Sequence, residues 1–155
     1  MTTQATGAAA LLTGLLIAGY VHAEPASPSP DLPGEYERFI YALETKATST
    51  ALQHLSQRHA IELGADAPWA DFKNSLPVIS VLDRILPMPR TSFESFQHNT
   101  ACLTVNGDDP GNEPTSIHVE FIQENSTWKM DYVQVVYHES EDDLPTAALC
   151  PQRLP

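Results

Sequence analysis

The chain has 155 residues and a formal net charge of −12, because 20 Asp and Glu outnumber 8 Lys and Arg. This balance argues against binding to nucleic acid or to anionic membrane surfaces, since both require basic patches. It favours a cationic partner, or it serves solubility alone.

The N-terminal stretch has the layout of a secretory signal. Residues 8–20 are almost wholly apolar but too few for a membrane span of about 20 residues, and 21–23 (Val-His-Ala) form an A-x-A-like cleavage site. We therefore expect a signal peptide at 1–23, a periplasmic or secreted protein, and no membrane attachment after cleavage. The segment before the apolar stretch has no Lys or Arg, so a retained anchor helix is the alternative.

A proline-rich spacer follows, and after it a single domain. Residues 24–33 contain four prolines among small residues, a composition typical of a stiff, solvated linker. Residues 34–155 are enough for one domain with its own hydrophobic core. Helical spacing of apolar residues predicts helices over 34–46 and 51–63, and one or two short helices over 67–86.

The second half of the chain changes to strand-like alternation. Strands are expected at 91–97 and 100–106, and a hairpin joins 117–123 to 128–137 through Asn125 and Ser126. This turn would place Phe121 opposite Met130, and Val119 opposite Tyr132. The predicted fold class is α+β, with N-terminal helices packed on one face of a twisted antiparallel sheet.

The predicted register separates two faces of the hairpin. The core face would carry Ile117, Val119, Phe121, Trp128, Met130, Tyr132 and Val136. The opposite face would carry His118, Glu120, Ile122, Lys129, Asp131, Val133, Val135 and Tyr137. A slip of one residue would exchange the two faces.

The chain has two cysteines, Cys102 and Cys150. An even pair in an exported protein is typical of a disulfide, which would hold the C-terminal segment against the body. A free reactive thiol is the alternative, although the sequence has no C-x-x-C motif to support it.

The order of elements and the hairpin 117–137, with its strand beginning Trp128-Lys129-Met130-Asp131, resemble the NTF2-like (SnoaL-like) family of α+β cone folds. The resemblance covers residues 34–138, and its specific part is the hairpin. It implies a helix-covered sheet, but it does not imply one function, because members include enzymes, ligand carriers and non-catalytic partners. The acidic C-terminal segment and the expected disulfide depart from the family pattern.

The sequence contains no recognisable catalytic or metal signature. Glu120 and Asp131 face each other in the predicted register with His118 nearby, and opposed carboxylates can raise each other's pKa for acid–base work. A solvated outer face, relieved by Lys129, is the simpler interpretation. No H-x-x-x-H or H-E-x-x-H motif is present, so we assign no catalytic residue, metal or cofactor.

The most distinctive remaining feature is an acidic run after the last strand, formed by Glu139, Glu141, Asp142 and Asp143. Such runs are commonly solvated tails, but acids held in place also steer encounter with a basic protein. The first hypothesis is a non-catalytic exported binding module, for example a periplasmic immunity or inhibitor protein that occludes a toxin or hydrolase. Its expected partner-binding residues are Glu139, Glu141, Asp142, Asp143, Val133, Val135, Tyr137, Glu120 and Asp131.

The second hypothesis is a small-ligand carrier or enzyme of the NTF2-like type. Its pocket would lie between the helices and the sheet and be lined by Tyr36, Trp69, Trp128 and Tyr132. The alternative is that these aromatic residues simply fill the core. Homodimerisation through the mixed sheet face is compatible with either hypothesis.

Overall fold

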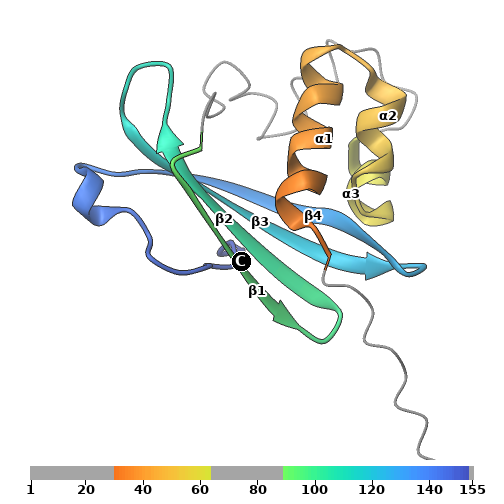
Figure 1. The fold of residues 1–155 in the computed structure, drawn as a ribbon. Helices are drawn as coiled ribbons and strands as arrows, with labels where there is room; N and C mark the ends of the chain where they lie inside the picture. Colours follow the sequence, from red (N-terminus) through yellow and green to blue (C-terminus); the bar gives the residue numbers. More distant parts are fainter. Residues whose placement is uncertain (1–29, 64–88, 154–155) are drawn as a thin grey trace, which may run out of the picture.

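The computed structural model describes residues 30–63 and 89–153. In these residues three helices precede a four-stranded antiparallel sheet, which confirms the predicted α+β class (Figure 1). The expected signal peptide at 1–23, nearly all of the spacer, and the helices expected within 67–86, including Trp69, lie outside the described residues.

Helix α1 (Leu32–Glu44) begins two residues before its predicted start. The Asp31 side chain caps it by accepting a hydrogen bond from the Gly34 backbone N–H at 3.0 Å. Pro33 suits the first turn, because N–H groups there have no intrahelical acceptor and proline has no N–H. Leu32 is 0 % exposed, so the end of the proposed spacer belongs to the hydrophobic core, and the prediction that 24–33 lies outside the core is wrong there.

The helix predicted over 51–63 is divided into α2 (Thr48–Gln53) and α3 (Gln57–Leu63). The chain between them runs beside strand β4 (Thr127–Tyr137), where Leu55 forms a parallel bridge with Met130. The Ser56 N–H donates to the Met130 carbonyl at 2.8 Å, and the Ser56 hydroxyl accepts from the His59 N–H at 3.1 Å. Ser56 therefore ends the bridge and caps α3 at the same time.

The sheet has the strand order β1-β2-β3-β4, with every neighbouring pair antiparallel. Strand β1 (Thr91–Gln97) pairs with β2 (Thr100–Asp108), which pairs with β3 (Pro114–Glu124), and β3 pairs with β4. The predicted hairpin turn is confirmed, because Asn125 and Ser126 join β3 to β4 with φ values of 49° and 65°. Positive φ at both positions is what a tight two-residue hairpin turn requires.

A β-bulge between Glu120 and Phe121 changes the register along the β3–β4 hairpin. Phe121 pairs with Met130 as predicted, but Val119 pairs with Val133 rather than with Tyr132. One extra residue on β4, Asp131, reverses the alternation of side chains beyond it. Tyr132 and Val136 therefore belong to the face opposite the helices, and Val133 and Val135 belong to the helix-covered face, contrary to both predictions.

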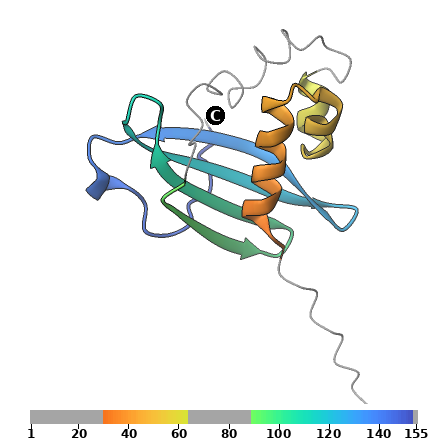
Figure 2. The ribbon, with the colours of Figure 1, turned by 45° about the horizontal axis from the view of Figure 1, so that its top comes forward.

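The hydrophobic core lies between the helices and one face of the sheet (Figure 2). Phe39 and Leu43 of α1 are buried, as are Leu103 of β2 and Phe121 of β3. Burial of a side chain of this size contributes about 1.5–3 kcal/mol. Among the described residues, the buried members of the core are Leu32, Tyr36, Phe39, Ala42, Leu43, Ala51, Leu55, Ala101, Leu103, Val105, Ile117, Val119, Phe121 and Met130.

Candidate functional site

The predicted disulfide is present, and it fixes the C-terminal segment on the face of the sheet opposite the helices. Cys102 of β2 is bonded to Cys150 across a sequence separation of 48 residues. We call residues 144–153 the C-terminal strap and the sheet face beneath it the outer face. After η2 (Glu141–Asp143) the strap returns toward β1 and β2 (Figure 1).

Polar side chains of the sheet hold the backbone of the strap. Asn106 donates from Nδ2 to the Pro145 carbonyl at 2.8 Å, and Thr104 Oγ1 accepts from the Leu149 N–H at 2.8 Å. Further along, Gln134 Oε1 accepts from the Gln152 N–H at 2.9 Å. Thr104 and Asn106 are buried, and they also contact the sheet, because Thr104 Oγ1 lies 3.0 Å from His118 Nδ1 and Asn106 Nδ2 donates to Thr91 Oγ1 at 3.1 Å.

The strap ends, within the described residues, in a charged cluster. The Arg153 guanidinium donates to Glu120 Oε1 at 2.7 Å and to Asp131 Oδ2 at 2.5 Å. It also lies over the Tyr132 ring, 5.5 Å from the ring centroid. We call Glu120, Asp131 and Tyr132 the guanidinium site, because three side chains from β3 and β4 converge on one guanidinium group.

Asp131 is held on its other side by the beginning of α3. Ser56 Oγ donates to its Oδ1 at 2.5 Å, and Arg58 lies 2.9 Å from its Oδ2. Arg58 also donates to the Asp131 backbone carbonyl at 2.8 Å. Burial favours the neutral carboxyl, but hydrogen bonds from Arg58, Ser56 and Arg153 outweigh it and lower the pKa of Asp131 to about 2.

The acid–base arrangement considered from the sequence is not the one found. Glu120 pairs across the sheet with Tyr132, and Asp131 occupies the bulge at the edge of β4. The two carboxylates share Arg153, and the pKa of Asp131 is lowered rather than raised as two opposed and unpaired carboxylates would require. Glu120 and Asp131 together bind a cation, the Arg153 guanidinium, and are not a pair of unpaired carboxylates sharing a proton.

A pocket of about 450 Å³ lies between the outer face and the strap, and His118 and His138 are among its lining residues. His118 Nδ1 is 3.0 Å from Thr104 Oγ1, and His138 Nε2 is 2.5 Å from Ser116 Oγ. Burial, and then repulsion from His138, lower the pKa of His118, which favours its neutral form. The described part of the chain holds no group of three or more His, Cys, Asp or Glu that could bind a metal.

The acidic segment 139–143 lies exposed at the end of the sheet where β4 finishes, and it is ordered by its own hydrogen bonds. Ser140 donates from its backbone N–H and from its hydroxyl to Asp143 Oδ2, at 3.1 and 3.0 Å. Arg90 bridges Glu141 at 2.8 Å and Asp108 at 2.6 Å. The segment is therefore a fixed turn between β4 and the strap rather than a loose tail.

The predicted partner-binding residues do not form one surface. Glu139, Glu141, Asp142 and Asp143 are exposed together, but Val133 and Val135 pack partly buried against the core. Glu120 and Asp131 are paired with Arg153, and Tyr137 is 41 % exposed. Val133 and Val135 therefore do not form an apolar surface beside the acidic segment, because the bulge places them on the helix-covered face.

The predicted ligand-pocket residues are also separated. Tyr36 is buried in α1, Trp128 packs at the edge of the core against Phe96, and Tyr132 lies on the outer face. The Tyr36 hydroxyl is buried without a hydrogen-bond partner among the described residues, and burial raises its pKa above the usual range. Tyr36 does not line any of three pockets of the described residues, which have volumes of about 750, 570 and 450 Å³.

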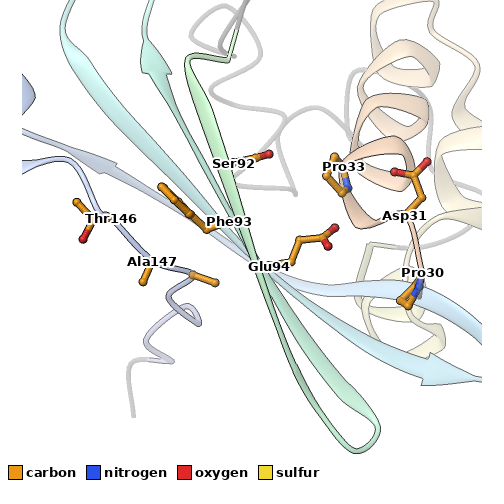
Figure 3. A pocket seen from close by; sticks show the side chains of 9 residues that line it. Pro30, Asp31, Pro33, Ser92, Phe93, Glu94, Thr146 and Ala147 are labelled. Atoms are coloured by element: carbon orange, nitrogen blue, oxygen red, sulfur yellow. The ribbon is translucent and has the colours of Figure 1, made fainter. Parts of the chain in front are cut away.

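The exposed edge strand β1 borders a shallow pocket of about 750 Å³ between the start of α1 and the strap (Figure 3). Ser92 and Glu94 point toward α1, and Phe93 points toward Thr146 and Ala147 of the strap (Figure 3). The pocket brings together no cluster of charged groups that would define a ligand.

Comparison with known proteins gives no match: no family model, no curated protein and no solved structure is significantly similar to this chain. The resemblance to the NTF2-like fold therefore stays a prediction. No helix of the described residues is long and apolar enough to cross a membrane.

Sequence reasoning missed the cations of the site. Arg58 and Arg153 lie 95 residues apart in the chain and share no motif, yet both bind Asp131. One signal was available for Arg153. If Cys150 is bonded to Cys102, the residues just after Cys150 must lie near Glu120, which is the cross-strand partner of Cys102.

Proposed function

We propose that this protein is a non-catalytic binding module that acts outside the cytoplasm and docks a basic protein partner through the acidic segment 139–143. A concrete version is a periplasmic immunity or inhibitor protein that blocks a toxin or hydrolase by occlusion. The observation that carries the proposal is that the acidic segment is exposed, ordered and attached to the body on both sides.

The attachment matters because binding costs less when the binding surface is already ordered. Before the segment, the His138 N–H donates to the Pro114 carbonyl at 2.8 Å, and after it Asn106 holds Pro145 at 2.8 Å. Fixed acids attract a basic partner over a distance of about a Debye length, roughly 8–10 Å in ordinary buffers. They also fix its orientation as it docks.

The test compares two variants that lose the same charge at different places. Glu139→Gln with Asp142→Asn removes two exposed acids of the segment and leaves Asp143, which caps the turn. Glu37→Gln with Glu44→Gln removes two exposed acids of α1. Each tagged full chain is used to capture basic proteins from the host's extracytoplasmic fraction at low and at high salt.

The proposal predicts that the wild type and the α1 variant retain the same basic protein at low salt and release it at high salt. The segment variant should retain roughly ten-fold less, because two close charges contribute about 1.4 kcal/mol in a docked, partly desolvated interface. Equal retention by the two variants would remove the role assigned to the segment.

A further inference from the structure

The guanidinium site has the chemistry of an arginine receptor. An arginine side chain offers several coplanar N–H donors and a flat cationic face, whereas a lysine ammonium is a compact point charge. Here two carboxylates accept from the same guanidinium nitrogen, at 2.7 and 2.5 Å, while the Tyr132 ring faces the guanidinium carbon. An aromatic face beneath a cation attracts it through the negative charge density of the ring face.

The receptor is held together by groups other than its occupant. Asp131 is fixed by Ser56 and Arg58, and Glu120 lies within β3, which is paired on both sides. Arg58 pairs with Asp131, which is one of the two carboxylates of the site, so removing Arg153 leaves the site with an excess negative charge. An empty site would therefore be both preformed and attractive to a cation.

The occupant can leave while the disulfide stays closed. Arg153 lies three residues beyond Cys150, and its side chain is 46 % exposed. Moving residues 152–153 outward breaks the contacts of Gln152 and Arg153 but leaves Pro151 buried and Thr104 and Asn106 bound to the strap. The outer face then remains covered, and only the guanidinium site opens.

We propose that Glu120, Asp131 and Tyr132 bind an arginine side chain of the partner protein, and that Arg153 fills this receptor in the free protein. This inference rests on the proposed function, because it names the residue by which a basic partner is recognised. In this arrangement the acidic segment steers the partner, and the guanidinium site selects arginine over lysine. Competition from Arg153 lowers the apparent affinity by the fraction of time that it occupies the site.

The experiment uses the full chain with its disulfide intact and two small probes, N-acetyl-L-argininamide and N-acetyl-L-lysinamide. Arg153→Ala empties the receptor, and Arg153→Lys keeps the charge but removes the planar donor group. Arg153→Ala combined with Glu120→Gln empties the receptor and removes one carboxylate. Binding is measured from the backbone amide NMR signals of Glu120 and Tyr132 as each probe is added.

We expect the arginine probe to bind Arg153→Ala about ten-fold or more tightly than it binds the wild type, since the internal competitor is gone. The lysine probe should bind the same variant about ten-fold more weakly than the arginine probe, and the double variant should lose the preference. Arg153→Lys should give an intermediate affinity and shows the effect even if Arg153→Ala loosens the strap.

Equal binding of the arginine probe to the wild type and to both Arg153 variants would overturn the inference, as would equal binding of the two probes to Arg153→Ala. These outcomes leave the proposed function standing, because the capture experiment changes Glu139 and Asp142 and does not alter the guanidinium site. Conversely, selective binding of the arginine probe stands even if neutralising the acidic segment has no effect on capture.

Discussion

The two faces of the sheet are covered by different kinds of contact. The helix-covered face is closed by apolar side chains such as Phe39 and Phe121, whose packing contacts have no fixed direction. The outer face is closed by the strap through one disulfide, side-chain hydrogen bonds and the Arg153 cluster. Apolar burial is non-directional, so it stabilises the fold, whereas directional contacts specify where one particular segment lies.

The two faces also differ in role: the helix-covered face stabilises the fold, and the strap side carries the proposed recognition sites. The strap is held mainly by its disulfide and polar contacts, since Leu149 is 49 % exposed and Pro151 is its one buried residue among those described. A segment held by a few specific contacts can be released in part without unfolding the core. For this reason both proposals concern the strap side of the molecule. Four predictions test the difference between the faces, from the largest expected effect to the smallest.

Removing the disulfide should have the largest effect. Replacing Cys102 and Cys150 together by Ser opens a loop with a sequence separation of 48 residues. The free energy of unfolding should fall by about 4 kcal/mol in the chain-entropy model. Urea unfolding measures the change, and reduced wild-type protein is the control that should match the variant. A decrease in the free energy of unfolding below about 1 kcal/mol would show that the disulfide does not constrain the unfolded chain as that model requires.

Asp131→Asn should lower the free energy of unfolding by about 2 kcal/mol at neutral pH, because it neutralises a carboxylate that accepts from two guanidinium groups and a hydroxyl. The folded pKa of about 2 lies below the usual aspartate pKa of 3.8. The stabilisation is therefore present above the unfolded pKa and is lost as the pH falls from about 4 to 2. The variant should show a flatter acid limb in unfolding measurements, and Asp142→Asn, at an exposed site, should not.

Tyr36→Phe should raise the free energy of unfolding, by up to about 1 kcal/mol, although it changes a buried residue of the core. The substitution removes a hydroxyl that is buried without a partner among the described residues and keeps the ring. Tyr41→Phe, at a position that is 68 % exposed, is the matched control and should change little. Destabilisation by Tyr36→Phe would mean that the hydroxyl has a bound partner.

His118 should give a smaller effect, visible as pH dependence. Its folded pKa is lowered by burial and by His138, so below about pH 6.5 the unfolded chain takes up a proton that the folded chain resists. Stability should therefore fall as the pH drops from about 6.5 toward the folded pKa. His118→Gln should weaken this dependence, and His98→Asn, at an exposed site with positive φ, should leave it unchanged.

The elements of the sheet could be predicted from the sequence because each has a local signal. Asn125 and Ser126 placed the hairpin turn correctly, and alternation predicted a strand at 100–106, which is observed as β2 (Thr100–Asp108). The start of α1 was missed by two residues because Pro33 was interpreted as part of the spacer, although proline is also favoured in the first turn of a helix.

The faces of β4 could not be predicted beyond the bulge. Met130-Asp131-Tyr132 contains no glycine or proline to mark the bulge, and the side-chain partners of Asp131 are Ser56, Arg58 and Arg153. Those contacts span long distances in the chain, so no local pattern encodes them. The same holds for the candidate site. Local patterns indicated the carboxylates Glu120 and Asp131, but they did not indicate Arg58 and Arg153, which pair with them.

The most direct test of the difference between the two faces is amide hydrogen exchange of the wild type before and after reduction of the disulfide. The account predicts that the amides of Leu149 and Gln152, which donate to Thr104 and Gln134, lose protection on reduction. Amides of the β2–β3 ladder should stay protected, since the apolar contacts of the core remain. Equal loss of protection in the strap and the ladder, or a strap that stays protected after reduction, would contradict it.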